Sequence, residues 1–180
     1  MNTINLPNLT VKTVFLVALA TGRRRSELHA ITMERSGIST DGKSFMLNLD
    51  RNFLAKSERL TRRDPKSLVI PSLPETETAE RSLCPVRALV TYLSRTSDIR
   101  TNSSAKKLFV SYKQGFKGDI STQTVSRWIS QAVRWAYAAS ATQPDLLQLH
   151  SIRAHEVRAY STSVALLRAA PLEDILEAAC

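Results

Sequence analysis

The sequence predicts a mainly helical α+β domain that carries a small antiparallel β-sheet. Two segments, residues 86–93 and 125–136, repeat apolar residues every three or four positions, which is typical of helices with one buried face. Residues 44–49 instead alternate apolar and polar side chains, which is typical of a half-buried strand. A chain of 180 residues has the size of one domain with a sizeable core, so residues 1–180 are expected to form a single unit.

The N-terminal part is expected to be helical. Thr10 is suited to cap a helix from Val11 to about Ala20, whose apolar residues surround the helix axis as in a buried core helix. Thr21-Gly22 is a helix-ending signal, and a second short helix is expected over Ser26–Ile31. The apolar run Val14–Ala20 is far too short to span a bilayer, and arginines follow it directly, so no association with a membrane is expected.

The sheet is expected in the next part of the chain. An Asp41-Gly42 turn precedes the strand predicted at 44–49, and Ser67–Leu73 is a second apolar strand. A long basic loop, Arg51–Lys66, connects the two strands and should protrude from the sheet. Pro74–Arg81 is interpreted as an acidic linker.

The second half of the chain returns to helical patterns. Pro85 suits the first turn of a helix, and four apolar residues then share one face: Val86, Leu89, Val90 and Leu93. A helix capped by Ser121 or Thr122 has a longer apolar stripe: Val125, Trp128, Ile129, Ala132, Val133 and Ala136. Trp135 is expected in the core beside this stripe. Two further helices are expected, at Ala154 to about Arg168 and at Leu172–Ala179.

Charge indicates the class of partner. The chain has 25 Lys and Arg against 16 Asp and Glu, a net charge of +9, which indicates a polyanionic partner, and a generically basic surface explains the charge equally well. Its two cysteines, Cys84 and Cys180, form neither a disulfide framework nor a ligand set for zinc. We therefore expect a protein of a reducing compartment, in the nucleus or cytoplasm.

Two short stretches near opposite ends of the chain carry residue types suited to phosphodiester chemistry. The first runs from Thr21 to Leu28 and the second from His155 to Arg158. Arginine donates two parallel hydrogen bonds to a phosphate and keeps its charge, and histidine or lysine can transfer a proton. We expect Arg24, His155 and Arg158 to converge on one concave, positively charged surface, because both arginines must reach the same phosphate.

These stretches resemble two motifs of the catalytic domain of tyrosine recombinases. The first motif, T-G-x-R-x-x-E-L, is matched by Thr21, Gly22, Arg24, Glu27 and Leu28. The second, H-x-x-R, is matched by His155 and Arg158. More closely, residues 83–96 and 154–163 resemble the recombinases of DIRS-like and Ngaro-like retrotransposons.

The resemblance implies a role for each matched residue. Arg24 and Arg158 would bind the scissile phosphate, and His155 would assist proton transfer at the nucleophile. Lys56, or alternatively Lys66, would protonate the leaving 5′-oxygen from the loop between the strands. Glu27 would orient the helix of Arg24. The implied partner is duplex DNA, with a homo-oligomer assembling on it and no metal or cofactor taking part. Further cations expected to contact DNA are Arg23, Arg25, Arg59, Arg62, Arg63, Lys66, Arg127 and Arg153.

The chain also departs from the family pattern. The family's third-position His or Trp and its tyrosine nucleophile should follow the last helix, and a separate domain should precede the catalytic one. We therefore expect a truncated catalytic domain that binds DNA without cleaving it, in which Tyr160 packs rather than attacks, so its status as an enzyme stays open. Two alternatives are a non-catalytic DNA-binding module and a helix-turn-helix regulator with Ser121–Ala139 as its recognition helix. The regulator leaves Arg24 and the second motif unexplained.

Overall fold

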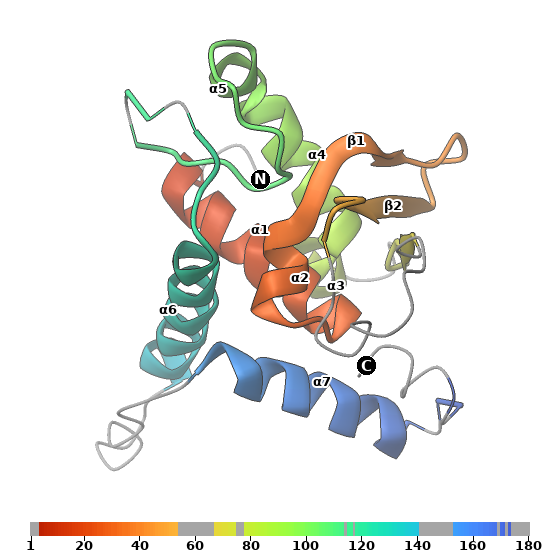
Figure 1. Cartoon of the computed structure of the whole chain (residues 1–180). Coiled ribbons are helices and arrows are strands. Elements are labelled where there is room, and N and C mark those ends of the chain that lie inside the picture. Colours follow the sequence, from red (N-terminus) through yellow and green to blue (C-terminus); the bar gives the residue numbers. More distant parts are fainter. Residues whose placement is uncertain are drawn as a thin grey trace.

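The computed structural model describes residues 4–53, 67–74, 78–113, 115–116, 118–140, 153–168, 170–171 and 173. Within these residues, the helices pack against one face of a three-stranded antiparallel sheet of order β1-β2-β3 (Figure 1), which confirms the mainly helical α+β class. The basic loop predicted between the strands falls outside the described residues from position 54 onward. The helix predicted at Leu172–Ala179 also lies outside them, apart from Glu173.

Helix α1 (Leu6–Thr21) forms the centre of the core and begins earlier than predicted. Asn5 is its cap, because the Asn5 side chain accepts the backbone N–H of Asn8 at 2.8 Å, and Pro7 sits in the first turn where no N–H is needed. The prediction that Thr10 caps the helix is wrong. Thr10 is buried inside α1, and its hydroxyl donates a hydrogen bond to a backbone carbonyl one turn earlier in the helix.

Helix α1 ends as predicted, and a short helix follows. Gly22 adopts a left-handed conformation (φ 60°) that closes the helix, a geometry in which only glycine is unstrained. Helix α2 (Arg25–Ala30) starts one residue earlier than predicted and passes directly into β1 (Ile31–Ile38). Strand β1 was not predicted. Its register with β2 (Ser44–Leu49) shifts between Thr32 and Gly37, so its alternation is broken.

The sheet presents one face to the core. In β2, Phe45 and Leu47 are buried, and Ile70 of β3 (Leu68–Pro71) pairs with Phe45 on the same face. Met46 and Val69 pair on the opposite face and are exposed. The predicted alternation of apolar and polar residues in this strand is therefore confirmed, and the second strand is shorter than predicted.

Three helices follow the sheet. Helix α3 (Thr78–Leu83) occupies part of the segment predicted as a linker, helix α4 (Pro85–Arg95) begins at Pro85 as predicted, and α5 (Ser97–Thr101) was not predicted. Cys84, the residue before α4, is buried as expected. Helix α4 packs against α1 with a face slightly rotated from the predicted one, so Val90 is exposed and Tyr92 is fully buried. Burial of Tyr92 is tolerated because its hydroxyl accepts the backbone N–H of Val110 at 2.8 Å.

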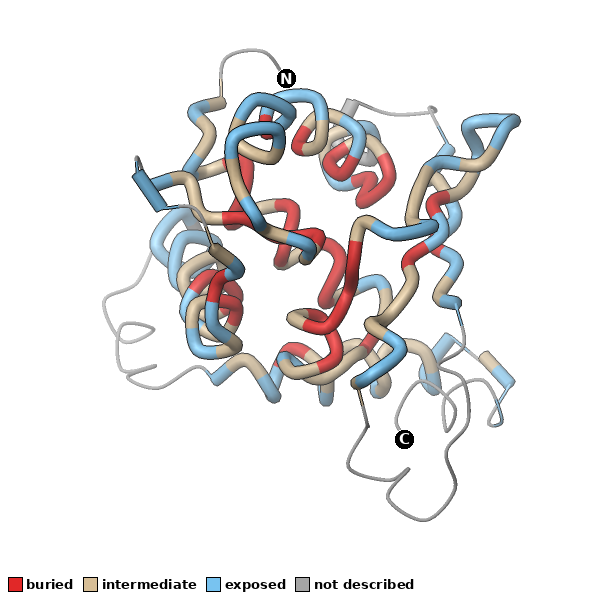
Figure 2. Tube along the Cα trace, turned by 45° about the horizontal axis from the view of Figure 1, so that its top comes forward, coloured by how far each residue is buried: buried red, intermediate tan, exposed pale blue. Residues whose placement is uncertain are grey.

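Helices α6 and α7 follow in the chain. Helix α6 (Thr122–Ser140) buries Val125, Trp128 and Ile129 in its first half, as predicted. Its second half extends past the core, so the prediction that Trp135 is buried is wrong. Helix α7 (Ala154–Leu167) matches the predicted bounds closely and runs across the ends of α1 and α6 (Figure 1). Figure 2 shows the buried residues collected in the centre of the molecule, around α1. Across the described ranges, no helix is long and apolar enough to cross a membrane.

Candidate functional site

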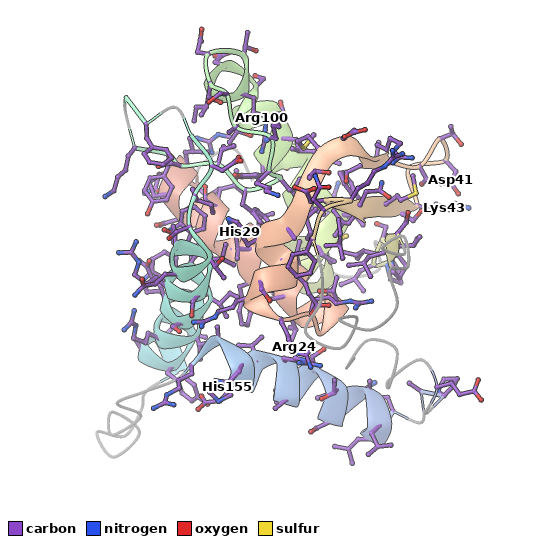
Figure 3. The ribbon with its side chains drawn as sticks, viewed as in Figure 1. Arg24, His29, Asp41, Lys43, Arg100 and His155 are labelled. Carbon is purple, nitrogen blue, oxygen red and sulfur yellow. The ribbon has the colours of Figure 1, made fainter. Side chains whose placement is uncertain are left out.

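Arginines from two helix starts line one cavity of about 510 Å³. The start of α2 contributes Arg23, Arg24, Arg25 and Ser26, α6 contributes Ser126 and Ser130, and α7 contributes Arg153, Ala154, His155 and Arg158. Figure 3 shows Arg24 reaching from the start of α2 toward α7, and His155 on the first turn of α7. The structure thus brings the two predicted stretches together, although they come from opposite ends of the chain. We call this site the arginine cavity.

The arginine cavity is suited to an anion. Five arginines and one histidine line it, and no carboxylate is among the lining residues. Clustered guanidinium groups attract phosphate, and each can donate two parallel hydrogen bonds to phosphate oxygens. Across the residues described, no group of His, Cys, Asp or Glu is arranged to hold a metal ion. The chemistry that the lining residues offer is therefore neutralisation of phosphate charge and, through His155, proton transfer.

Glu27 fixes the chain where it enters α2. Its buried carboxylate accepts the backbone N–H of Arg24 at 2.7 Å through Oε2 and the guanidinium of Arg23 at 3.1 Å through Oε1. The pair is shielded from water, because the side chains of Arg23 and Glu27 are only 13% and 3% exposed. Glu27 does not line the cavity, so its contacts orient the two arginines that do.

The start of α7 has the same bond between a glutamate carboxylate and the backbone N–H of an arginine. Arg153 precedes the helix, and the carboxylate of Glu156 accepts its backbone N–H at 3.0 Å. The spacing R-x-x-E is the same as that from Arg24 to Glu27. At α7, however, both side chains are exposed. Two helices therefore begin at the arginine cavity with an arginine at the cap position and a glutamate one turn later.

Helix α7 contacts the end of α1 beside Gly22. The hydroxyl of Ser161 donates to the backbone carbonyl of Leu19 at 2.6 Å. A Cβ at Gly22 would lie 3.5 Å from the Ser161 hydroxyl and 3.7 Å from a methyl of Thr162. The end of α1, and with it the entry to α2, is thus held against the helix that carries Arg158.

A second bond connects α2 to the start of α6. The ring of His29 lies within hydrogen-bond distance of the Ile120 carbonyl, at 2.7 Å through Nε2. Ser126 and Ser130 of α6 face the arginine cavity. They were missed from the sequence, since serines four apart on a helix carry no signal beyond sharing a face.

The other predicted site residues lie elsewhere. Arg127 projects from the opposite flank of α6 and lines a different cavity. The cations of the basic loop fall outside the described residues: Lys56, Arg59, Arg62, Arg63 and Lys66. Their positions relative to the arginine cavity stay a prediction.

None of the four tyrosines lines the arginine cavity, and all four are among the described residues. Tyr92 is buried, and Tyr112 stacks on Trp128. Tyr137 and Tyr160 line a second, largely apolar cavity of about 360 Å³ that α1, α6 and α7 enclose. The prediction that Tyr160 packs in the fold is wrong, because Tyr160 is 64% exposed.

Comparison with known proteins adds little to these observations. No known family model matches the sequence, and no curated protein matches it. Among solved structures, the chain is similar to a lambda integrase described as a tetramer bound to a Holliday junction. The TM-score is 0.41 and the identity 14%, and the match covers 91% of this chain and 37% of the integrase.

Proposed function

We propose that the arginine cavity binds a backbone phosphate of duplex DNA, and that the chain is part of the catalytic domain of a tyrosine recombinase. The observation that carries the proposal is the convergence of Arg24, His155 and Arg158 in one cavity that no carboxylate lines. The match of these residues to the two recombinase motifs supports it. The net charge of +9 supplies the general attraction to a polyanion.

In this proposal each residue has a defined task. Arg24 and Arg158 donate hydrogen bonds to the non-bridging phosphate oxygens, which gain charge as the nucleophile attacks phosphorus. A tyrosine oxygen forms a bond to phosphorus while the bond to the 5′-oxygen breaks, and Lys56 or Lys66 gives that oxygen its proton. His155 assists proton transfer at the nucleophile. Glu27 positions Arg24 without touching DNA, which fits its buried contacts.

The 180-residue chain itself is proposed to bind DNA without cutting it. In-line displacement needs a nucleophile held about 3 Å from phosphorus, and none of the four tyrosines lines the arginine cavity. Arginines that stabilise charge cannot replace a missing nucleophile. The finer parts of the proposal are kinship with DIRS-like and Ngaro-like elements, assembly as a homo-oligomer on DNA and a place in the nucleus or cytoplasm. The kinship rests on residues 83–96 and 154–163.

One alternative is weakened by packing. A helix-turn-helix regulator would read DNA with the predicted segment Ser121–Ala139, which corresponds to α6. Trp128 in the centre of that helix is 5% exposed and stacks on Tyr112, so it faces the protein. The regulator also gives no task to the arginines at α2 and α7. A non-catalytic DNA-binding module would use the same cavity, and a covalent band in the cleavage test would exclude it.

The binding test uses the two motif arginines. We expect Arg24→Ala and Arg158→Ala together to flatten the slope of log affinity for duplex DNA against log salt by about two, since each lost phosphate contact removes about 0.9 from the slope. Arg24→Lys should restore charge but not the paired hydrogen bonds. The matched control is Arg81→Ala, an exposed arginine on α3. A double variant that behaves like the control would refute the proposal.

The cleavage test uses a nicked suicide duplex and a denaturing gel. A covalent protein–DNA band is not expected from the 180-residue chain. A band that disappears on changing one of its tyrosines to phenylalanine would show that this tyrosine reaches phosphorus. That result would overturn the binding-only part of the proposal while leaving the role of the arginines intact.

A further inference from the structure

A second polar cavity lies on the other flank of α6. It has a volume of about 440 Å³, and the residues that matter for its chemistry are Tyr112, Lys113 and Phe116 from the segment before α6, and Thr124, Arg127 and Trp128 from α6 itself. Three aromatic rings and two cations thus surround one cavity. We call it the aromatic cavity.

Two of the three rings of the aromatic cavity stack on each other, and the third is more exposed. Trp128 is buried, and the ring of Tyr112 stacks on it with centroids 5.7 Å apart and planes inclined by 27°. Phe116 is 46% exposed at the rim. Packing explains the first two rings, since they join the core. Phe116 is not part of the core, so its partly exposed ring is accessible to a ligand.

The charges of the cavity are available to a ligand. Lys113 is exposed, and Arg127 is exposed with its guanidinium 3.3 Å from the hydroxyl of Thr124. Within the described part of the chain, neither cation forms a salt bridge. Asp119, the one carboxylate among the lining residues, already accepts the backbone N–H groups of Lys106 and Lys107 at 2.9 and 3.1 Å. The cavity therefore combines aromatic faces with a net positive rim.

We propose that the aromatic cavity binds an unpaired nucleobase of a DNA strand, with Lys113 and Arg127 near its phosphate. Aromatic faces beside cations are the combination that proteins use to hold single-stranded nucleic acid, because every base has a face that can stack. The arginine cavity differs, since mainly cations and hydroxyls line it and no Phe, Tyr or Trp does. The arginine cavity therefore suits the phosphate of a nucleotide, and the aromatic cavity suits its base.

The position of α6 connects the two sites. Ser126 and Ser130 face the arginine cavity, whereas Thr124, Arg127 and Trp128, on the same turns, face the aromatic cavity. The sites are therefore separated by the thickness of one helix with its side chains, about 10–12 Å. This inference rests on the proposed function. The strand whose phosphate is bound at the arginine cavity would place one of its bases in the aromatic cavity, on the other side of α6. We expect DNA with an unpaired base to bind more tightly than fully paired DNA.

The first experiment tests the cavity alone. Trp135→Phe leaves Trp128 as the only tryptophan, because the chain has two. Its fluorescence, excited beyond the absorption of the base, is followed during titration with deoxyadenosine monophosphate and, in parallel, deoxyribose 5-phosphate. We expect a saturable change with the nucleotide and none with the sugar phosphate. Equal responses to both would overturn the assignment to a base.

The second experiment uses DNA. A duplex with one bulged base is compared with the same duplex carrying an abasic bulge and with the fully paired duplex. Phe116→Ala should weaken binding of the bulged base by about 5- to 150-fold, the range reported for loss of one stacked base, and leave the paired duplex within about twofold. Phe116→Trp should retain the preference. Tyr160→Ala, which removes an exposed ring outside the cavity, is the matched control.

The outcomes separate this inference from the proposed function. If Phe116→Ala weakens all three duplexes equally, the cavity contacts only the backbone and the inference fails. If it changes none of them, the surface serves another partner, such as a protein, and the inference also fails. The proposed function fails separately, when the double variant of Arg24 and Arg158 binds paired duplex as the parent does.

Discussion

Glu27 and Glu156 provide a matched pair for measuring what holds the arginine cavity in shape. Each carboxylate accepts the backbone N–H of an arginine three residues earlier, at 2.7 Å for Glu27 and 3.0 Å for Glu156. Glu27 is buried and also binds the guanidinium of Arg23, whereas Glu156 is exposed. The difference between the two glutamate-to-alanine variants therefore isolates the buried ion pair.

The magnitudes follow from these contacts. Loss of the cap bond should lower the free energy of unfolding by about 1 kcal/mol in either variant. Glu27→Ala also leaves the nearly buried guanidinium of Arg23 without its partner, which costs about 3–5 kcal/mol more. Glu27→Gln keeps an oxygen for the backbone N–H but loses the charge, and should cost about 1.5–3 kcal/mol. A typical domain has only about 5–15 kcal/mol in total, so the alanine variant will be close to unfolding.

The assay is urea unfolding monitored by tryptophan fluorescence and circular dichroism. The free energies of unfolding are compared between variants that show the same dependence on urea concentration. Glu27→Gln and Glu156→Gln decide the question if Glu27→Ala does not fold. A Glu27→Gln variant as stable as Glu156→Gln would refute the reasoning, since it would mean that the buried pair contributes nothing beyond the cap. Weaker DNA binding by Glu27→Gln at full stability would instead locate its effect in the orientation of Arg24.

Three further predictions concern pH and salt. Burial raises the pKa of the Tyr92 hydroxyl to about 12, which favours the protonated folded form; stability should therefore fall as the pH rises from about 10 to 12, and Tyr92→Phe should remove that alkaline loss in unfolding curves. A hydrogen bond from a lysine lowers the pKa of Asp50, so its contribution is present above about pH 4 and lost as the pH falls through the depressed value; Asp50→Asn should flatten the acid side of the stability profile. Replacing Arg59, Arg62 and Arg63 with alanine should reduce the salt dependence of duplex binding by about two to three units, and an unchanged slope would place the DNA surface elsewhere.

Local patterns predicted the elements whose packing is simple. The alternation at 44–49 and the apolar stripe of α6 correspond to one buried face each, and both were predicted close to their observed positions. Strand β1 was missed because Glu34, Arg35 and Ser36 occupy its middle, where the register shifts and Arg35 takes a positive φ of 59°. Its pairing is set by β2 and by the Ser36 hydroxyl oxygen, which accepts the backbone N–H of Asn48, and no local pattern encodes either contact.

Other errors came from tertiary context. Trp135 lies beside the C-terminal end of the apolar stripe, but this part of α6 extends past the core, and helix length alone does not reveal where the packing partner ends. Arg24 and Arg158 were predicted to meet because one phosphate demands both, so chemistry supplied a long-range constraint that periodicity lacks. Ser126, Ser130 and the aromatic cavity became apparent only once α6 was placed between two surfaces.

The two motif arginines, Arg24 and Arg158, lie on elements that differ in local stability. Arg24 follows directly from α1, the most buried helix, and its backbone is fastened by a buried carboxylate. Arg158 lies on α7, of whose described residues Val157 is the buried one, and the Ser161 hydroxyl donates a hydrogen bond to the Leu19 carbonyl of α1. Because α7 buries so little, we expect it to open locally at a lower free energy than the core around α1. A phosphate bound by both arginines would slow amide hydrogen exchange in α7 far more than in α1. Occupancy of the site would therefore be measurable from the hydrogen exchange of α7.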